Sequence, residues 1–333
     1  MTPRVVVTRA IPEVAIEQLR AVADVWVSPH DRALSPAELH AAVAGADGVV
    51  TLLHDRVDDA FLAAAGPQLR VVANVAVGYD NVDVDACERR DVVFTNTPGV
   101  LTNATADLAI SLILMVTRRL AEGERLIRSQ EPWAWNMFFL LGTEIAGKTL
   151  GIVGLGQIGQ ATARRACAFG MTIIYSGRRR ADPAVEAELG ARYVSFDELL
   201  ETADVVSLHC PLTDETRHLI DASRLAQMQR AAFLINTTRG PVVDEGALVD
   251  ALRDGVIAGA GLDVFEREPL VHEGLIPLDN AVLVPHMGSA TIETRTAMAM
   301  LAARNVIAVL AGEPAPTQVV TAPRVPSEPA PRS

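Results

Sequence analysis

Residues 149–165, TLGIVGLGQIGQATARR, carry the clearest indication of the fold of this chain. An apolar strand pattern, TLGIV, leads directly into three glycines at G-x-G-x-x-G spacing, and a helical run follows them. Between a strand and a helix this spacing is a strong signal, whereas the glycines alone would be a weak one. Gly154 allows a tight turn, Gly156 lets the backbone approach a pyrophosphate, and Gly159 allows close packing of helix on strand.

The same stretch therefore predicts a dinucleotide site in a parallel α/β sheet. Gln157 and Ile158 open the helix, whose N-terminus presents the positive end of its dipole to a phosphate. The alternative is a glycine-rich turn in an α/β domain that binds no ligand.

The end of the next strand bears on which dinucleotide is bound. NAD enzymes usually carry an Asp or Glu there, about 20 residues after the glycines, to accept a hydrogen bond from the ribose 2′-OH. Here the sequence is Tyr175-Ser176-Gly-Arg178-Arg179-Arg180, without an acid. A hydroxyl and several guanidinium groups suit a 2′-phosphate. We expect NADP(H) to be preferred, with NAD(H) possible, and Arg178 and then Arg179 to make the contacts. The alternative is a solvated basic turn.

Size and composition limit the remaining possibilities. The 333 residues favour two domains, and the net charge of −12 argues against nucleic-acid and anionic membrane partners. Three cysteines at wide spacing, Cys87, Cys167 and Cys210, suit neither a disulfide framework nor a metal site. With no signal peptide and no run long enough to span a bilayer, we expect a soluble, cytoplasmic protein without a bound metal.

Strand and helix patterns alternate along the chain, which predicts α/β architecture with parallel strands. Ser35, Pro36 and Glu38 are typical of a capped helix start. Residues 101–129 are expected to form one long helix, capped by Thr102 or Asn103 and buried in its apolar early part. Strands are expected at 4–8, 25–27, 48–52, 71–75, 149–153, 172–175, 205–209, 232–236, 259–262 and 282–284, and further helices at 12–23 and 291–311.

Two other segments stand out by composition. Residues 132–141 hold two of the three tryptophans of an aromatic-poor chain, Trp133 and Trp135, which indicates either an interface or a loop that packs on its own domain. Residues 321–333 are rich in proline and polar residues, so we expect this tail to be disordered.

Three ionisable residues stand at predicted strand ends or in the loops that follow, where open α/β sheets bind ligands. They are Arg239 in INTTRGPVVDEGAL, Glu268 in GLDVFEREPL and His286 in VLVPHMGSAT. Reduction of a 2-keto acid needs a proton donor, and histidine is the usual one near neutral pH. Glu268 could orient and pair with a protonated His286, and Arg239 could hold a carboxylate. Each residue also has a structural interpretation, such as an Arg239 pair with Asp244 or Glu245.

These segments resemble the D-isomer-specific 2-hydroxyacid dehydrogenase family over residues 4–320, and within it the glyoxylate/hydroxypyruvate reductases. The stretches VANVAVGYDNVDV, NTPGVLTNATADLA and AGLDVFEREP, and the basic turn SGRRR, are similar to theirs. The resemblance implies Arg239, Glu268 and His286 as the catalytic residues and reduction to the D-2-hydroxy acid.

The resemblance also implies the remaining contacts. Substrate binding is expected at Val77, Gly78 and Ser289, with Arg239. Further cofactor contacts are expected at Thr105, Cys210, Pro211, Thr237, Thr238 and Asp263, where Asp263 would meet the nicotinamide carboxamide and Thr105 the phosphates.

For the architecture, the resemblance implies two Rossmann-like, doubly wound domains. The smaller, flavodoxin-like substrate domain would be discontinuous, from residues 1–100 and 290–333, around a dinucleotide-binding domain at 101–289. The substrate would bind in the cleft between them, and the chain would form a homodimer through residues 132–141 and the long helix.

Two other functions stay open at this point. The same fold could act on another small anion: phosphite, D-lactate or 3-phosphoglycerate. A third possibility is a non-catalytic module that senses NAD(H), as some corepressors of similar fold do.

Overall fold

The computed structural model describes residues 2–320, which form two compact units. One unit contains the chain up to Val100 together with the described residues from Ile292 onward, and the other is Leu101–Thr291. The disorder expected for residues 321–333 lies outside the described residues. None of the helices between residues 2 and 320 combines the length and the apolar character needed to cross a bilayer.

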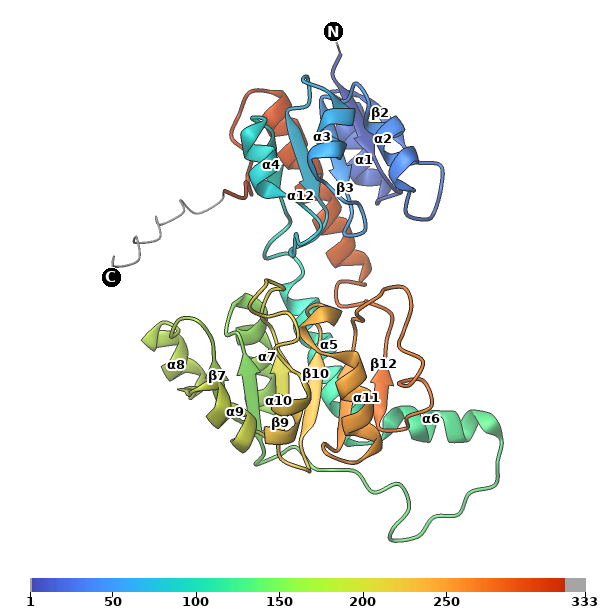
Figure 1. Ribbon diagram of the computed structural model, residues 1–333, viewed down its shortest axis with the longest axis vertical. Helices are drawn as coiled ribbons and strands as arrows, with labels where there is room; N and C mark the ends of the chain where they lie inside the picture. Colours follow the sequence, from blue (N-terminus) through green and yellow to red (C-terminus); the bar gives the residue numbers. More distant parts are fainter. Residues whose placement is uncertain (1, 321–333) are drawn as a thin grey trace, which may run out of the picture. The chain divides into compact units, whose positions relative to one another are not determined.

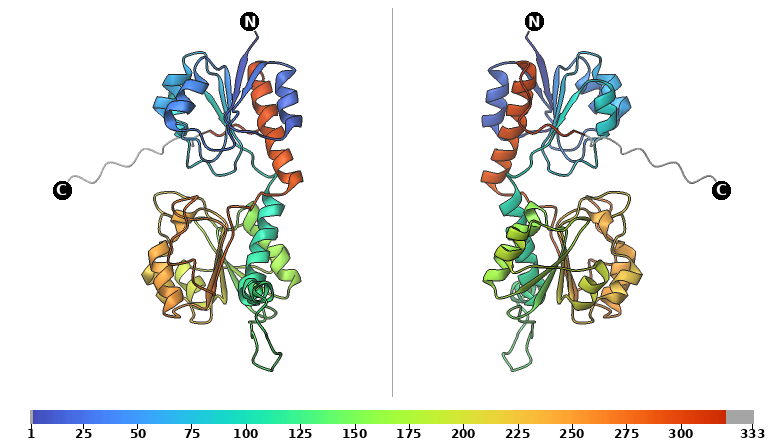
Figure 2. Two further views of the ribbon diagram at one scale, coloured as in Figure 1. Left: turned by 90° about the vertical axis from the view of Figure 1, so that its right-hand side faces the viewer. Right: turned by 90° about the vertical axis from the view of Figure 1, so that its left-hand side faces the viewer.

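The first unit is a five-stranded parallel sheet in the order β2-β1-β3-β4-β5 (Figures 1 and 2), which is the flavodoxin-like order. Its elements are β1 (Arg4–Val7), α1 (Glu13–Arg20), β2 (Asp24–Val27), α2 (Pro36–Val43), β3 (Gly48–Thr51), α3 (Asp59–Ala65), β4 (Val71–Asn74), α4 (Val84–Arg89), β5 (Val93–Thr95) and α12 (Ile292–Leu310).

Strand alternation gives this sheet two apolar faces, because successive side chains point to opposite sides. Val5 and Val7 pack with residues of α1 and α12, while Val6 packs with residues of α2, α3 and α4. The late helix α12 thus completes a layer that the first hundred residues cannot build alone. The capping box predicted at the start of α2 is confirmed: Ser35 and Glu38 each accept a hydrogen bond from the other's main-chain N–H.

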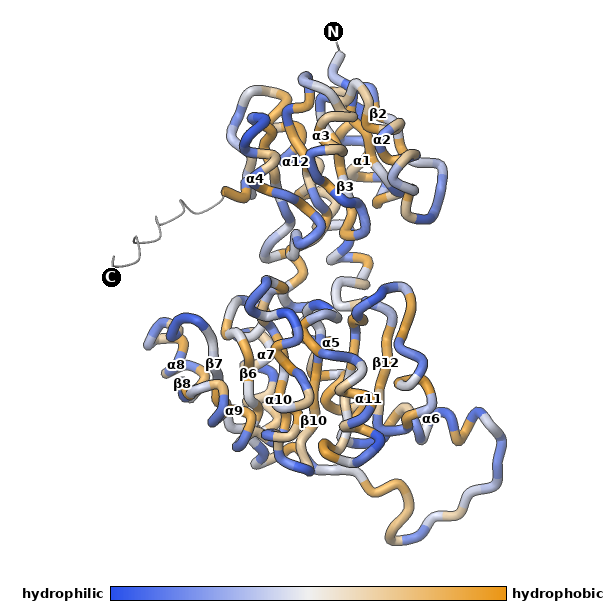
Figure 3. Tube along the Cα trace, in the orientation of Figure 1, coloured by the Kyte–Doolittle hydropathy of each residue, from blue (hydrophilic) through white to orange (hydrophobic). Residues whose placement is uncertain are grey.

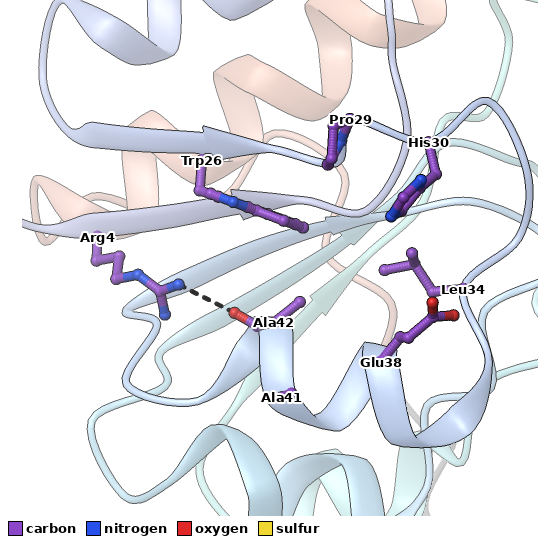
Figure 4. A pocket seen from close by; sticks show the side chains of 8 residues that line it. All are labelled: Arg4, Trp26, Pro29, His30, Leu34, Glu38, Ala41 and Ala42. Carbon is purple, nitrogen blue, oxygen red and sulfur yellow. Dashed lines mark hydrogen bonds between the residues drawn. The ribbon is translucent and has the colours of Figure 1, made fainter.

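A surface hollow of about 390 Å³ lies between β2 and α2 (Figure 4). Its lining includes Trp26, His30 and Leu34 and none of the site residues predicted from the sequence. The Arg4 guanidinium beside it donates to the carbonyls of Ala42 and Ala44. This arginine therefore closes the C-terminal end of α2.

The second unit is a seven-stranded parallel sheet in the order β12-β11-β10-β9-β6-β7-β8. Its elements are α5 (Thr102–Thr117), α6 (Leu120–Ser129), β6 (Thr149–Val153), α7 (Gln157–Ala168), β7 (Thr172–Ser176), α8 (Pro183–Leu189), β8 (Arg192–Tyr193), α9 (Phe196–Thr202), β9 (Val205–Leu208), α10 (Ala222–Gln227), β10 (Phe233–Asn236), the 3₁₀ turn η1 (Gly240–Val242), α11 (Glu245–Arg253), β11 (Gly259–Leu262) and β12 (Ala281–Leu283).

Each face of this sheet carries its own helices (Figure 2). Side chains of α5, α7 and α8 pack with Leu150 and Ile152 on one face, and those of α9, α10 and α11 pack with Leu208 and Leu234 on the other. The chain passes from one side of β6 to the other between β8 and β9, so the sheet has a switch point between β6 and β9. The predicted fold class, two doubly wound parallel-sheet units, is confirmed.

The single long helix predicted for residues 101–129 is wrong, because the chain forms α5 and α6 with a left-handed Arg119 (φ 55°) between them. The Thr117 carbonyl, which a continuous helix would offer to the N–H of Ala121, instead accepts the N–H of Thr143 at 2.7 Å. The loop that returns past α5 at Thr143 therefore ends this helix.

The predicted cap of that helix is wrong as well. Leu101 is the N-cap residue of α5 and makes no side-chain capping bond, while Thr102 and Asn103 lie inside the first turn. The Asn103 side chain instead accepts a hydrogen bond from Arg165 of α7 at 3.2 Å. Packing of α5 against α7 therefore takes the side chain that the sequence pattern assigned to the cap.

Candidate active site

The site residues predicted in the second unit lie at one edge of its sheet, apart from Thr105 on α5. All strands are parallel, so the loops that follow β6, β7, β9, β10, β11 and β12 leave from the same edge. Ligands bind at this edge in open α/β sheets, at the switch point. The switch point lies between β6 and β9, whose loops carry the glycine motif and Cys210-Pro211.

The glycine motif has the close contacts that its spacing predicts. Gly154 adopts φ +96°, and a side chain there would meet the His209 carbonyl at 3.0 Å. A side chain at Gly159 would collide with the Gly154 carbonyl, so α7 can pack on β6 only with glycine at this position. At Gly156, by contrast, a Cβ would meet nothing within 4 Å. The backbone before α7 is thus open toward a ligand.

The polar groups around this loop fit a dinucleotide. Gly156 is the N-cap residue of α7 and cannot cap it with a side chain, so the first-turn N–H groups at Gln157 and Ile158 have no such partner. The Oγ1 atom of Thr237 and the Nδ1 atom of His209 are buried, and among the described residues neither has a hydrogen-bond partner. Buried polar groups without partners are rare in folded proteins, and a polar ligand is one way to satisfy them.

The three arginines of the basic turn after β7 differ in their contacts. Ser176 is buried at the strand end, and Arg180 pairs with Glu186 at 2.8 Å. Arg178 and Arg179 are exposed, and within residues 2–320 neither makes an ion pair. A hydrogen bond from Thr213 and the positive charge of Arg178 both lower the pKa of Glu215.

His286 and Glu268 are in direct contact, as predicted. The His286 Nδ1 atom lies 2.7 Å from Glu268 Oε2, and the Phe265 N–H donates to Glu268 Oε1 at 3.1 Å. Burial raises the pKa of Glu268, but the hydrogen bond and charge of His286, the Phe265 N–H and Arg239 outweigh it and hold this pKa below its ordinary value. Glu268 is therefore ionised at neutral pH, and the Nε2 side of the ring is left for a ligand.

The backbone of His286 is held in a left-handed conformation (φ 47°) by Asp263. The carboxylate of Asp263 accepts the N–H groups of Met287 at 2.6 Å and Gly288 at 2.9 Å, and its carbonyl accepts the N–H of His286 at 2.8 Å. Burial raises the pKa of this carboxyl above its usual range. Such a backbone persists only where its surroundings fix it, and this is typical of active sites.

Thr105 belongs to the same loop anchor. Its buried hydroxyl donates to the Gly288 carbonyl at 3.2 Å, beside the loop that carries His286 and Ser289. Thr105 and Asp263 thus both hold this loop in place. These two roles were not predicted from the sequence. The missed partners are main-chain groups, and no sequence pattern marks them. The cofactor contacts predicted for both residues stay predictions.

Arg239 lies in the loop that follows β10, three residues after Asn236, and this loop packs on the one that carries Glu268. The Asn236 amide donates to the Arg239 carbonyl at 2.9 Å, and Thr238 also bonds to Asn236. A side chain at Gly240 would collide with the main chain of Phe265, so only glycine allows this approach. The carboxylates of Asp244 and Glu245 accept main-chain N–H groups, from Ala247 and Glu266.

In the first unit, Val77 and Gly78 lie in the loop after β4, at the carboxyl edge of that sheet. The Asn96 amide fixes this loop by donating to the Val77 carbonyl at 2.8 Å. Asn96 is tied in turn to Thr317, whose hydroxyl donates to its carbonyl at 2.7 Å. Asn96 was not predicted, because its partners come from distant parts of the chain.

Comparison with known proteins assigns the family. The family model of the D-isomer specific 2-hydroxyacid dehydrogenase NAD binding domain matches residues 110–288. Glyoxylate reductases from Thermococcus onnurineus and Pyrococcus furiosus are 51% and 50% identical to the chain, over 96% of it and 96% of their own length.

Solved structures agree over nearly the full chain. A glyoxylate reductase attributed to "Paecilomyes thermophila" is 36% identical, with a TM-score of 0.86 over 96% of this chain and 98% of its own. An NADPH-dependent glyoxylate/hydroxypyruvate reductase from Sinorhizobium meliloti, solved with NADP and malonate, is 35% identical, with a TM-score of 0.81 over 96% and 97%. With its nicotinamide-dinucleotide domain and its histidine–glutamate pair, the chain belongs to the D-isomer-specific 2-hydroxyacid dehydrogenase family of oxidoreductases.

Proposed function

We propose that this protein reduces glyoxylate to glycolate and hydroxypyruvate to the D-2-hydroxy acid, with NADPH as the preferred reductant. The observation that carries the proposal is the 2.7 Å contact between His286 and an ionised Glu268 at the sheet edge. The names of the relatives support the choice of substrates, since several that are about half identical over nearly the full length are glyoxylate reductases.

His286 is assigned as the proton donor to the new hydroxyl. Glu268 holds Nδ1, so Nε2 faces the reacting oxygen, where the proton is needed. Asp263 and Thr105 keep the ring in place through the loop backbone. In the oxidative direction the same Nε2 atom takes the proton.

Arg239 is assigned to the substrate carboxylate. A guanidinium offers two parallel N–H donors to a carboxylate, and this geometry fixes the orientation of a molecule as small as glyoxylate. We assign Val77 and Gly78 of the first unit, and Ser289 of the second, to the remaining substrate contacts.

The cofactor would be held by the open backbone at Gly156 and the N-terminus of α7, with Thr237, Thr238, Cys210 and Pro211 beside it. When bound, it supplies the hydride that reduces the carbonyl carbon. Arg178, Arg179 and Ser176 form a cationic, hydroxyl-bearing site suited to a 2′-phosphate, whereas an acid suited to a 2′-hydroxyl is absent from the strand end.

We further propose a homodimer formed through α6 and residues 132–141, in a protein of the cytoplasm. Helix α6 buries none of its residues, and the following segment exposes large apolar side chains. The backbone tube of the loop after α6 is orange, the colour of hydrophobic residues, over part of its length (Figure 3). They include Trp133, Trp135, Met137 and Phe138, of which Phe138 is 84% exposed. Exposed apolar groups concentrated in this way are typical of interfaces.

The substrate proposal is tested by following absorbance at 340 nm, as oxidation of NADPH or NADH with glyoxylate, hydroxypyruvate and pyruvate and as reduction of NADP+ or NAD+ with phosphite. We expect glyoxylate or hydroxypyruvate to be the best substrate, and His286→Asn to lower kcat by about 10²- to 10⁴-fold, the usual contribution of a general acid. The control His30→Asn changes an exposed histidine of the first unit and should match the wild type. If the protein turned over only phosphite, the proposed keto-acid substrate would be wrong. If it bound nucleotide but turned over nothing, a sensing module would be favoured.

Cofactor preference is tested with Arg178→Ala. Because charge-assisted hydrogen bonds contribute about 1.5–3 kcal/mol, the KM for NADPH should rise about 10- to 100-fold while that for NADH changes little. Arg180→Ala, which removes the partner of Glu186, should leave the ratio of the two KM values unchanged. A wild-type preference for NADH, or equal changes for both cofactors, would refute the phosphate assignment.

The dimer is tested by sedimentation velocity of the double variant Trp135→Asp, Phe138→Asp. Burying two carboxylates in an apolar interface is costly, so the variant should sediment as a monomer where the wild type is a dimer. Val22→Asp alters an exposed valine of the first unit and should leave the wild-type state intact. A monomeric wild type, or a variant that stays dimeric, would contradict this interface.

A further inference from the structure

Three neighbouring loops of the candidate site are tied together behind the catalytic residues. The loop after β9 extends to His218, and the main-chain N–H of this residue donates to the Pro241 carbonyl at 2.8 Å. Ile220 then pairs with Val243 like a short parallel strand. The loop after β10, which carries Arg239, is thus held from the β9 side.

Two glutamates hold the same loop from the β11 side by a reciprocal contact. The Glu266 N–H donates to Glu245 Oε1 at 2.6 Å, and the Glu245 N–H donates to Glu266 Oε1 at 3.2 Å. His218 Nε2 lies 2.9 Å from the same Glu266 oxygen, so all three loops meet at one carboxylate. Glu245 is only 6% exposed, and burial raises its pKa.

This arrangement is unusual for two acidic side chains. Two carboxylates that lie close together repel each other, so the contact costs free energy unless other interactions offset the repulsion. Here each one satisfies a main-chain donor of the other segment, and Glu245 also stands in the first turn of α11, where the helix dipole favours a negative charge.

The contact joins the two loops whose relative position matters for the chemistry. Glu266 is two residues before Glu268, the partner of His286, and Glu245 is six residues after Arg239. Between them, Gly240 brings the two main chains into van der Waals contact. Any loosening of the glutamate contact would therefore move Arg239 relative to His286.

We propose that Glu245, Glu266 and His218 form a latch that positions Arg239 against the Glu268–His286 pair and thereby sets the site for a small 2-keto acid. The inference rests on the proposed function, because it assigns Arg239 to the carboxylate and His286 to the carbonyl of the same molecule. A two- or three-carbon acid has no remote groups that could correct a misplaced site, and an error of 1 Å can cost about 100-fold in rate.

The latch is tested with Glu245→Ala and its conservative counterpart Glu245→Gln. The amide oxygen of glutamine can still accept the Glu266 N–H, so Glu245→Gln should keep activity within about threefold. Glu245→Ala should lower kcat/KM for glyoxylate about 100-fold, mainly through KM, while the Kd for NADPH, read from its fluorescence, stays within about twofold. His218→Asn, which tolerates the left-handed backbone of His218 (φ 50°), should show a smaller loss in the same direction.

Asp204→Ala is the matched control. Asp204 also accepts a main-chain N–H, that of Thr149 at 2.8 Å, but at the opposite edge of the same sheet. It should change stability without changing the KM for glyoxylate. If Glu245→Ala behaves like Asp204→Ala in kinetics, or if Glu245→Gln loses as much as Glu245→Ala, the latch is refuted.

Hydrogen exchange separates the latch from the proposed function. In Glu245→Ala, exchange should rise in residues 239–243 and 264–268 and stay at the wild-type rate around the glycine motif. If the wild type reduces no keto acid but this exchange pattern appears, the latch stands and the substrate proposal fails. Unchanged exchange in both segments would refute the latch whatever the wild type reduces.

Discussion

The chemistry proposed for this chain depends on the hydrogen bond between Glu268 and His286, which joins the loops of two neighbouring strands. The bond needs an ionised carboxylate, and His286 together with the Phe265 N–H and Arg239 keeps Glu268 ionised in spite of burial. It also needs a fixed imidazole, and Asp263 supplies this by accepting two N–H groups from the loop that follows the histidine. Parallel strands make the arrangement possible because their carboxyl ends share one edge.

Much of this could be predicted from local sequence. The glycine motif between TLGIV and its helix located the cofactor loop, and the contacts at Gly154 and Gly159 are those its spacing implies. The pairing of Glu268 with His286 was also predicted, since both residues follow strands that end at the same edge. Short-range spacing was sufficient for the glycine motif, whereas the choice of Glu268 and His286 also drew on the family resemblance.

What could not be predicted depends on partners that are distant in sequence. Helix α5 ends at Thr117 because the N–H of Thr143 takes its carbonyl, and the polar side chains expected to cap the helix are used elsewhere. Asp263, Thr105 and Glu245 act on main-chain groups of other loops, and such groups carry no residue identity that a pattern could detect. The supporting contacts of the site are therefore visible only in the fold.

Glyoxylate reduction measured over a range of pH is the first test of whether the Glu268–His286 pair delivers the proton. We would compare kcat/KM from pH 5 to 10 for the wild type and Glu268→Gln. The Glu268 carboxylate lies 2.7 Å from His286 Nδ1, where it orients the ring and places a negative charge beside it, and a glutamine amide carries no charge, so kcat/KM of the variant should lie below that of the wild type across this range. A variant with the wild-type profile and the wild-type rate would show that this pair does not deliver the proton.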